Sequence, residues 1–479
     1  MLFSSTFFLF IFLPTLLVLY FAVIKKFSSA ESTKHRNILL LIASLIFYAW
    51  GEPIFVLVMM LCIGANYGFG LLADQYKNEK DKMRWVFTGM LVFNLGILGI
   101  FKYAGFIVSN LNGLLGLSLD VPSITLPIGI SFFTFQGISY VVDVYRGHGK
   151  VLKNPLDVGL YISFFPQLIA GPIVRYETVA KEIEHRTENE KDFVEGIARF
   201  IIGMAKKVIL ANQFALIADK AYSLPVDSLS IGFAWMGAIA YMLQIFFDFA
   251  GYSDMAIGLG KMFGFHFTEN FNAPYSAKSV SDFWRRWHIS LGSWFRDYVY
   301  IPLGGSRTTK LKMFRNIFVV WLLTGIWHGA NWTFIVWGVY FGVILVIEKF
   351  TSLGKFMEKS KVIGHIYTLI LVLISWVIFK ADSLSGAINY MKAMIGMGSD
   401  IMMGSLADLY LKDNFILYIV GMVACMPLIK WYKKLYEAAN SKVSVALQGV
   451  NIAVLGCMFL VAISYLVKGT YNPFIYFNF

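Results

Sequence analysis

Long apolar runs recur along the whole chain and constrain its fold more than any other feature. A helix needs about 20 apolar residues to cross the hydrocarbon core of a bilayer, and most of the runs approach or exceed that length. They cover residues 7–24, 38–50, 53–72, 85–101, 123–142, 157–173, 196–218, 229–250, 316–348, 363–379, 415–430 and 445–467. The pattern predicts an all-α polytopic membrane protein with about 11 transmembrane helices. The remaining apolar segments are expected to form re-entrant and amphipathic helices.

The composition excludes other classes of protein. Of the 479 residues, 58% are hydrophobic and 15% are charged, whereas soluble domains are about 45–50% apolar and about 25% charged. So little polar surface rules out an ordinary soluble enzyme and a disordered chain. The cysteines Cys62, Cys425 and Cys457 lie in apolar runs without metal-ligand spacing, so we expect neither a disulfide scaffold nor a metal site.

Lys and Arg are distributed unevenly along the chain. Residues 103–145 and 221–260 contain neither, whereas residues 73–84 and 261–315 are rich in both. Because Lys and Arg collect in cytoplasmic loops, the basic loops are expected inside and the uncharged loops outside. The first run is followed by basic residues instead of being preceded by them, so it reads as an uncleaved span with its N-terminus outside. The same rule explains the net charge of +12 without a nucleic-acid partner.

Two runs are poorly suited to a simple crossing. Residues 159–172 contain Pro166 and Gln167, and irregular backbone at membrane depth is tolerated only beside protein or a water-filled cavity. We therefore expect a re-entrant or broken helix there. The run 316–348 would be about 50 Å long as one helix, and its glycines and Asn331 predict a break. The sequence has no internal repeat of the kind that many transporters carry.

Two of the seven histidines differ from the others in their sequence surroundings. His328 follows Trp327 and precedes Asn331 within an almost wholly apolar run. An intramembrane ionisable residue usually faces a cavity and marks a functional site, although a satisfied structural histidine is the alternative. The neighbouring glycines let backbone or substrate approach closely, which favours function. The other histidines lie in charged or terminal stretches, except His266, which we expect to pack in an aromatic loop.

The second of these histidines, His288, lies in a stretch of aromatic and basic residues at positions 281–298. At 100° per residue, Trp284 and further aromatic residues share one helix face with His288 at its margin, while Arg285 and Arg286 lie opposite. This predicts an interfacial amphipathic helix with aromatic side chains among the headgroups and arginines on phosphates. We expect His288 to have a functional role in addition.

Two acidic residues, Asp248 and Asp254, lie at the predicted cytoplasmic end of an apolar run. A carboxylate in that position can cap the following helix or pair with a basic loop, and we expect a structural role of this kind for both.

No motif of covalent catalysis is present. The sequence lacks a Gly-x-Ser-x-Gly elbow, a phosphate-binding Gly-rich loop, a His-Glu-x-x-His site and paired metal-binding cysteines. A histidine in low-dielectric surroundings is suited to removing a proton from a weak nucleophile at neutral pH. If the acyl donor is already activated as a thioester, an enzyme needs only such a base, a positioned hydroxyl and a path for both substrates.

Several motifs together resemble the membrane-bound O-acyltransferase (MBOAT) family. The matching segments are residues 164–175, 248–254, 269–275, 283–291 and 327–329. They are most similar to the bacterial branch that contains the membrane subunits for O-acetylation of alginate and peptidoglycan and for D-alanylation of teichoic acid. The resemblance covers most of the chain, is densest between residues 160 and 340, and implies a single membrane-embedded domain over residues 1–479.

The resemblance implies a central tunnel ringed by helices, with His328 at its middle as general base and His288 as a second polar group. The residues expected to line or support this tunnel are Trp327, Asn331, Trp284, Arg285, Arg286, Gln167, Pro166 and Asp248. No metal and no permanently bound cofactor are expected.

The implied reaction moves an acetyl or other short acyl group across the bacterial cytoplasmic (inner) membrane. The donor would be a cytoplasmic thioester, either acetyl-CoA or an acyl carrier protein, and the final acceptor an extracytoplasmic polysaccharide. Membrane lipids and an extracytoplasmic acetyltransferase that completes the transfer are the expected partners.

The chain ends in an aromatic segment, residues 468–479, which the predicted topology places outside. One interpretation is an interfacial anchor. A similar tail recurs in the bacterial branch, so the alternative is that Tyr476 dips into the outer mouth of the tunnel and accepts or guides the acyl group.

Two other functions remain open at this point. The first is D-alanyl transfer from a carrier protein to teichoic acid. The second is transport of lipid-linked sugars, in which the histidines and broken helices would line a pathway. Repeat symmetry and charged residues near midspan would favour the transporter.

Overall fold

The described part of the chain is entirely helical in its regular structure. The computed structural model describes all residues except 25–32, 399–400, 429–430, 433–436, 438–440, 470, 473–474 and 476–479. Within that part no strand is present, which confirms the predicted all-α class. The chain divides into two compact units, residues 1–200 with 252–268 and residues 201–251 with 269–479. The single-domain expectation for residues 1–479 stays a prediction.

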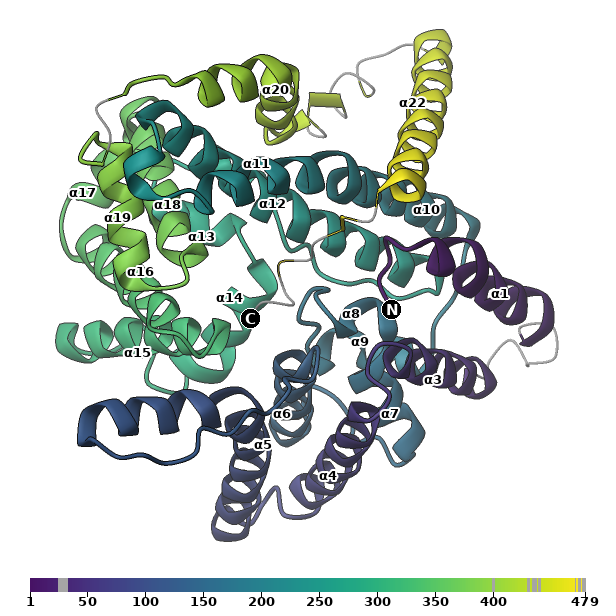
Figure 1. Ribbon diagram of the computed structural model, residues 1–479. Helices are drawn as coiled ribbons and strands as arrows, with labels where there is room; N and C mark the ends of the chain where they lie inside the picture. The colour runs from purple at the N-terminus through teal and green to yellow at the C-terminus, as the bar shows by residue number, and fades with distance from the viewer. Residues whose placement is uncertain are drawn as a thin grey trace. The chain divides into compact units, whose positions relative to one another are not determined.

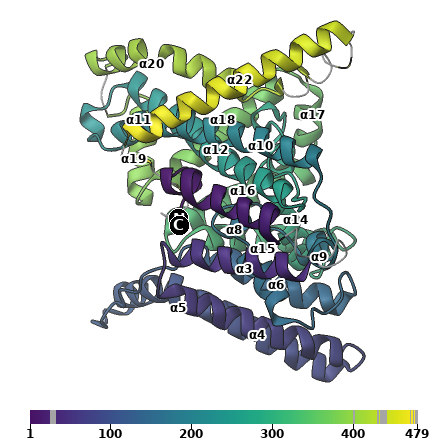
Figure 2. The same cartoon turned by 90° about the vertical axis from the view of Figure 1, so that its right-hand side faces the viewer.

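The first unit contains the N-terminal helices (Figure 1). Its elements are η1 (Phe8–Phe12), α1 (Leu13–Leu17), η2 (Val18–Ile24), α3 (Lys34–Ala49), α4 (Phe55–Gln75), α5 (Lys80–Leu115), α6 (Ile130–Arg146), α7 (Pro155–Ser163), α8 (Phe165–Leu168) and α9 (Tyr176–Glu184), with parts of α10 (Glu190–Ala205) and α12 (Ile231–Met262). The long helices α4 and α5 run beside each other (Figure 2). The buried Asn66 and Asn94 join them, each amide donating to the other's carbonyl oxygen at 2.9–3.0 Å.

The second unit holds the remaining parts of α10 and α12 and every later element. These are η3 (Lys206–Ala211), α11 (Asn212–Tyr222), η4 (Val226–Ser228), η5 (Pro274–Ser276), α13 (Val280–Arg286), α14 (Ile289–Phe295), η6 (Arg296–Tyr300), α15 (Lys310–His328), α16 (Trp332–Phe350), α17 (Leu353–Lys359), α18 (Ile363–Lys380), α19 (Leu384–Met394), α20 (Ser405–Ala424) and α22 (Ser441–Lys468). Its core is rich in aromatic side chains from α12, α13, α16 and α18.

Seven helices in the described ranges are long and apolar enough to cross a membrane. They differ in how much of the apolar window is buried within the protein, from 83% in α12 to 6% in α22. An apolar surface that the protein itself does not cover needs a non-aqueous neighbour, since water would penalise it. This agrees with a multi-pass membrane protein, with α12 enclosed by protein and α22 largely exposed.

Both runs that were expected to break do so. In the first unit, α7 ends at Ser163 and α8 starts at Phe165, with Pro166 in the first turn of α8. Proline lacks an N–H group and favours a helix start. The N–H group of Phe165, the first residue of α8, donates to the hydroxyl oxygen of Ser44 at 3.0 Å.

The second break, within the second unit, separates α15 from α16. Helix α15 ends at His328, and Asn331 caps α16 by accepting the N–H of Thr333 at 3.1 Å. The two helices pack closely because Gly325 faces Gly338. A Cβ atom added at either position would collide with the backbone of the other helix. This packing fixes the end of α15, where His328 lies.

Helix α13 is anchored to α16 through a buried carboxylate. Glu348 accepts the N–H groups of Val280 and Ser281, both at 2.8 Å, and the hydroxyl of Ser281. A negative charge at a helix N-terminus is favourable because the first N–H groups have no helical partner. The anchor fixes the segment that leads to His288.

Candidate active site

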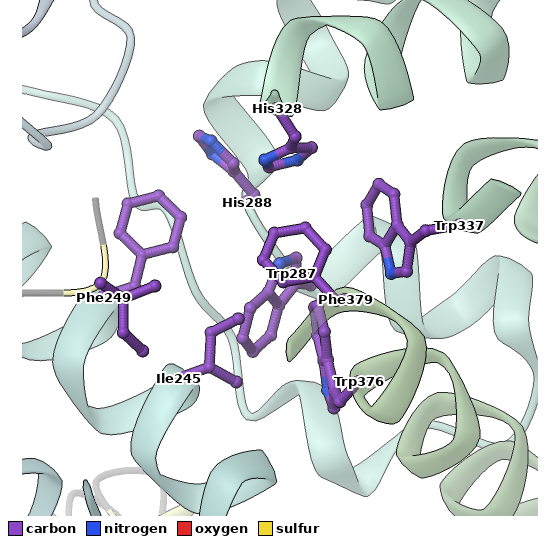
Figure 3. A pocket seen from close by; sticks show the side chains of 9 residues that line it. Ile245, Phe249, Trp287, His288, His328, Trp337, Trp376 and Phe379 are labelled. Carbon is purple, nitrogen blue, oxygen red and sulfur yellow. The ribbon is translucent and has the colours of Figure 1, made fainter. Parts of the chain in front are cut away.

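His288 and His328 line the same cavity in the second unit. The other side chains around it are apolar or aromatic: Ile245 and Phe249 of α12, Trp287, Trp337 of α16, Trp376 and Phe379 of α18, and Ile475 of the tail. In Figure 3 the two imidazole rings reach into the cavity between Phe249 and Trp337. The volume of the cavity is about 20 Å³, which is enough for about one water molecule.

His328 is held by aromatic rings at the C-terminal end of α15. Its ring centroid lies 4.9 Å from that of Trp327, 5.0 Å from that of Trp337 and 5.2 Å from that of Phe379, all in edge-on arrangements. Edge-on aromatic contacts are favourable and directional. They fix the ring plane of His328 in the apolar cavity.

His288 lies between α13 and α14 in a left-handed backbone conformation, with φ of 46°. The predicted continuous amphipathic helix over residues 281–298 is therefore wrong. The chain reverses here because the N–H of Ile289 donates to the main-chain oxygen of Asn270, at 3.0 Å, and the N–H of Asn272 donates to that of Arg286, at 2.9 Å. These bonds tie the segment to a loop distant in sequence and turn the histidine inward.

The imidazole of His288 is 2% exposed and stands edge-on to Phe249, with ring centroids 4.6 Å apart. Its Nδ1 lies 3.1 Å from Oδ1 of Asn270, and its Nε2 has no hydrogen-bond partner among the described residues. His288 lies outside the candidate spans, and burial lowers its pKa to about 3. A neutral imidazole with an open ring nitrogen can accept a proton.

Asp248 adjoins the cavity wall without lining it. Its Oδ1 lies 2.5 Å from Nζ of Lys207, and both side chains are 2% exposed. Its Oδ2 accepts the N–H of Ile475 at 2.9 Å. We expected a cap or a pairing with the basic loop. The structure instead shows a buried ion pair within apolar helices, whose carboxylate also binds the main chain of Ile475 at the cavity.

Two other predicted site residues, Trp284 and Trp327, contact side chains of the cavity wall without lining the cavity. Trp284 packs edge-on against Trp321, Trp337 and Phe341. Trp327 contacts both histidines, with its ring centroid 6.1 Å from that of His288.

The polar members of the predicted set are engaged elsewhere in that unit. Arg285 pairs with Glu358 at 3.0 Å, and Arg286 with Asp282 at 3.0 Å. Asn331 caps α16 and donates to the main-chain oxygen of Asp382 at 3.0 Å.

Two further predicted residues lie in the first unit, and the position of a third is not described. Pro166 and Gln167 are buried in the first unit, where the Gln167 amide donates to the main-chain oxygen of Tyr161 at 2.5 Å. Tyr476 lies outside the described residues. Its neighbour Ile475 is described and lines the cavity.

The sequence analysis did not single out Asn270, Lys207 or Ile475. Lys207 had a usable signal, because a lysine within the apolar run 196–218 needs an anionic partner, and Asp248 lies in the next run. Asn270 was visible only as part of the segment 269–275. Ile475 was not named, although the hypothesis that Tyr476 dips into the tunnel mouth concerned the same segment.

One group with metal-ligand geometry occurs in the described part of the first unit. Atoms of Asp143, His148 and Glu177 lie within 4.8 Å of one another. Glu177 is already paired with Arg175 at 2.8 Å, and its own N–H donates to Asp143 at 3.1 Å. These contacts join the end of α6 to the start of α9 and account for the cluster as a structural junction.

The cavity offers proton transfer without a protein nucleophile. Among the described residues that line it, none is Ser, Cys, Lys, Asp or Glu. Two imidazoles in apolar surroundings can take a proton from a hydroxyl and return it to a leaving group.

Comparison with known proteins places these features in context. The model of the membrane-bound O-acyltransferase family matches residues 150–386. A probable alginate O-acetylase of Azotobacter vinelandii is 42% identical over 429 residues, covering 88% of this chain and 84% of the relative. A peptidoglycan O-acetyltransferase of Helicobacter pylori is 36% identical over 427 residues, covering 83% and 80%. A teichoic acid D-alanyltransferase of Bacillus subtilis is 33% identical over 253 residues, covering 49% and 61%.

Proposed function

Since the chain belongs to the membrane-bound O-acyltransferase family and is an O-acyltransferase, we propose that it passes an acetyl or similar short acyl group to a hydroxyl for O-acetylation of an extracytoplasmic polysaccharide. One observation carries this proposal: His288 and His328 share one apolar cavity whose described lining residues include no Ser, Cys, Lys, Asp or Glu. Relatives named as O-acetylating proteins match over most of the chain, which favours acetyl over D-alanyl transfer.

The proposed catalytic residues are His328 and His288. The family resemblance implies that His328 is the general base and that His288 supports it. The attacking oxygen bonds to the thioester carbonyl carbon as its proton passes to the histidine pair. The carbon–sulfur bond then breaks, and the proton passes to the leaving thiolate. General acid–base catalysis of this kind contributes about 10²–10⁴-fold to a rate.

The site is part of a membrane protein, and the proposal places it in the bacterial inner membrane. The donor would be acetyl-CoA or an acyl carrier protein on the cytoplasmic side. An extracytoplasmic acetyltransferase would complete the transfer to the polysaccharide. Tyr476 remains the proposed relay at the outer mouth, and the position of Ile475 in the cavity wall supports it.

The test is acyl turnover by purified full-length protein in lipid nanodiscs. Acetyl and D-alanyl thioesters, each on coenzyme A and on a carrier protein, are offered with a hydroxyl acceptor, and product is followed by mass spectrometry. We expect acetyl transfer by the native protein and a loss of about 10²-fold or more in His328→Ala.

An active His328→Ala variant would remove the catalytic assignment. Turnover of the D-alanyl thioester alone would establish the second enzyme function. Movement of a lipid-linked sugar without any acyl turnover would replace the proposal with the transporter.

A further inference from the structure

The hydrogen bonds around Asn270 determine which nitrogen of His288 carries a proton. The Oδ1 of Asn270 lies 3.2 Å from the backbone nitrogen of Ser290, 2.9 Å from its hydroxyl and 3.1 Å from Nδ1 of His288. A backbone N–H can only donate, so the Asn270 atom that faces it must be the carbonyl oxygen and not the amide nitrogen.

That oxygen in turn requires a donor on the imidazole. The hydroxyl of Ser290 lies 3.4 Å from Nδ1 but donates its one hydrogen to Asn270 at 2.9 Å. Two lone pairs facing each other at 3.1 Å would repel, so Nδ1 of His288 carries the hydrogen. Because His288 is neutral, its Nε2 must then be unprotonated. Nε2 is buried and has no partner in the described part of the chain, which leaves its lone pair available to the cavity that His288 lines.

The arrangement is costly, which argues that it serves the site. His288 has φ of 46°, a left-handed conformation that is unfavourable for a non-glycine residue. The amide nitrogen of Asn270 is buried without a hydrogen-bond partner among the described residues, which also costs stability. A loop selected for stability alone would avoid both.

We propose that Asn270 is a positioning residue that holds His288 in the Nδ1–H tautomer, so that Nε2 accepts the hydrogen bond of the attacking hydroxyl inside the cavity. This inference rests on the proposed function and gives His288 a direct share in accepting the proton. As the oxygen bonds to the acyl carbon, its O–H bond breaks and the proton goes to the histidine pair. The same proton reaches the thiolate when the carbon–sulfur bond breaks.

Few other titratable groups face His288. His328 on α15 lines the same cavity. On α12, Asp248 is neutralised by Lys207 of η3. On α13, Arg286 pairs with Asp282.

Glu269 precedes Asn270 in the loop and is exposed. Asn270 is buried, and its oxygen lies 3.1 Å from Nδ1 of His288. A charge introduced at position 270 would therefore act on the imidazole at close range.

Asn270→Asp tests this through the pH profile. Aspartate keeps the acceptor oxygen but adds a negative charge, which raises the pKa of an adjacent imidazole, typically by 1–3 units. We expect the acid limb of kcat to move up by about one pH unit or more, with near-native activity above it.

Asn270→Ala should lower kcat about 10–100-fold with little change in KM, since removing a partner that orients a functional histidine typically has that effect.

The matched controls are Asn272→Asp and Asn272→Ala. Asn272 is exposed two residues along the same loop, and only its backbone joins the hydrogen bonds to Arg286. Both controls should keep the native profile. The inference would be overturned if the native protein is active and both Asn270 variants keep its kcat and the acid limb of its pH profile.

Nitrogen-15 NMR of histidine-labelled native protein provides a second test that needs neither turnover nor folding of the Asn270 variants. His288→Asn supplies the difference spectrum that identifies the two ring nitrogens. We expect a protonated Nδ1 and an unprotonated Nε2, and a protonated Nε2 would overturn the inference. If the tautomer is as expected but no acyl transfer occurs, the proposed function fails while the role of Asn270 in the tautomer stands.

Discussion

His288 in the second unit and His266 in the first show how differently one side chain can be used. His288 is 2% exposed, with an amide oxygen as its polar partner. The side chain of His266 is 48% exposed and lies between two carboxylates, 2.8 Å from Glu182 and 3.1 Å from Asp192. The first setting favours the neutral ring that a base requires, and the second favours the charged ring.

The two settings move the histidine pKa in opposite directions. At His288, burial lowers the pKa to about 3. At His266, burial acts against the charged form, but hydrogen bonds to Glu182 and Asp192 outweigh it and raise the pKa. Partner atoms and burial therefore distinguish a candidate base from a surface ion pair more sharply than sequence position does.

The largest expected effect separates these histidines by activity. His288→Ala should reduce acyl transfer by about 10²–10⁴-fold, because it removes a proton acceptor. His266→Ala should change it less than a few-fold, because it removes only a surface ion pair. Initial rates of thioester turnover, at matched amounts of folded protein, make the comparison. Equal losses in both variants would show that the cavity is not the site of chemistry.

The ion pairs of the second unit extend the comparison to stability. Asp248→Ala leaves Lys207 buried beside an empty partner site and should destabilise the protein by about 3–5 kcal/mol. Glu358→Ala breaks the exposed pair with Arg285 and should cost at most about 1 kcal/mol.

Thermal unfolding in detergent, followed by tryptophan fluorescence, ranks the two variants. Similar shifts in melting temperature would contradict the difference in burial. Asp248→Asn provides the milder control, since it keeps the shape and one acceptor for the N–H of Ile475.

The smallest expected effect is a difference in how stability depends on pH. At His288 the folded-state pKa lies below the unfolded value of about 6.5, so the unfolded chain binds more protons between about pH 3 and 6.5. This histidine therefore makes stability fall as pH drops through that range. At His266 the folded-state pKa is raised, so its contribution is present below about pH 6.5 and is lost as pH rises through the folded value.

Melting temperatures measured across pH should show both slopes. His288→Asn should reduce the loss of stability on the acid side, and His266→Gln should reduce the loss at higher pH. If the two variants changed the profile in the same direction, the opposite assignments of charge would be wrong.

Much of the fold followed from hydropathy and from backbone chemistry. The all-α class and the breaks near Pro166 and Asn331 are set by local rules, because proline and asparagine favour the start of a helix. Seven candidate spans occur in the described residues, and the predicted number of about 11 stays a prediction. His266 was wrongly expected to pack in an aromatic loop, because its carboxylate partners lie 74 and 84 residues away.

The candidate site was harder to predict for the same physical reason. A sequence can mark His288 and His328 as unusual. The hydrogen bond between His288 and Asn270, however, joins residues 18 positions apart, and the one between Ile475 and Asp248 joins residues 227 positions apart. The amphipathic pattern around His288 was real, yet main-chain bonds to a distant loop overrode helix periodicity. Tertiary contacts of this kind leave no periodic trace.

The left-handed backbone at His288 also has an evolutionary consequence. Glycine and asparagine adopt φ near 46° more readily than histidine does. A population of this protein selected in the laboratory for heat resistance alone should therefore drift toward Gly or Asn at position 288, gaining stability while the chemistry disappears. Persistence of histidine at that position would then measure selection for turnover, in competition with the folding preference of the chain itself.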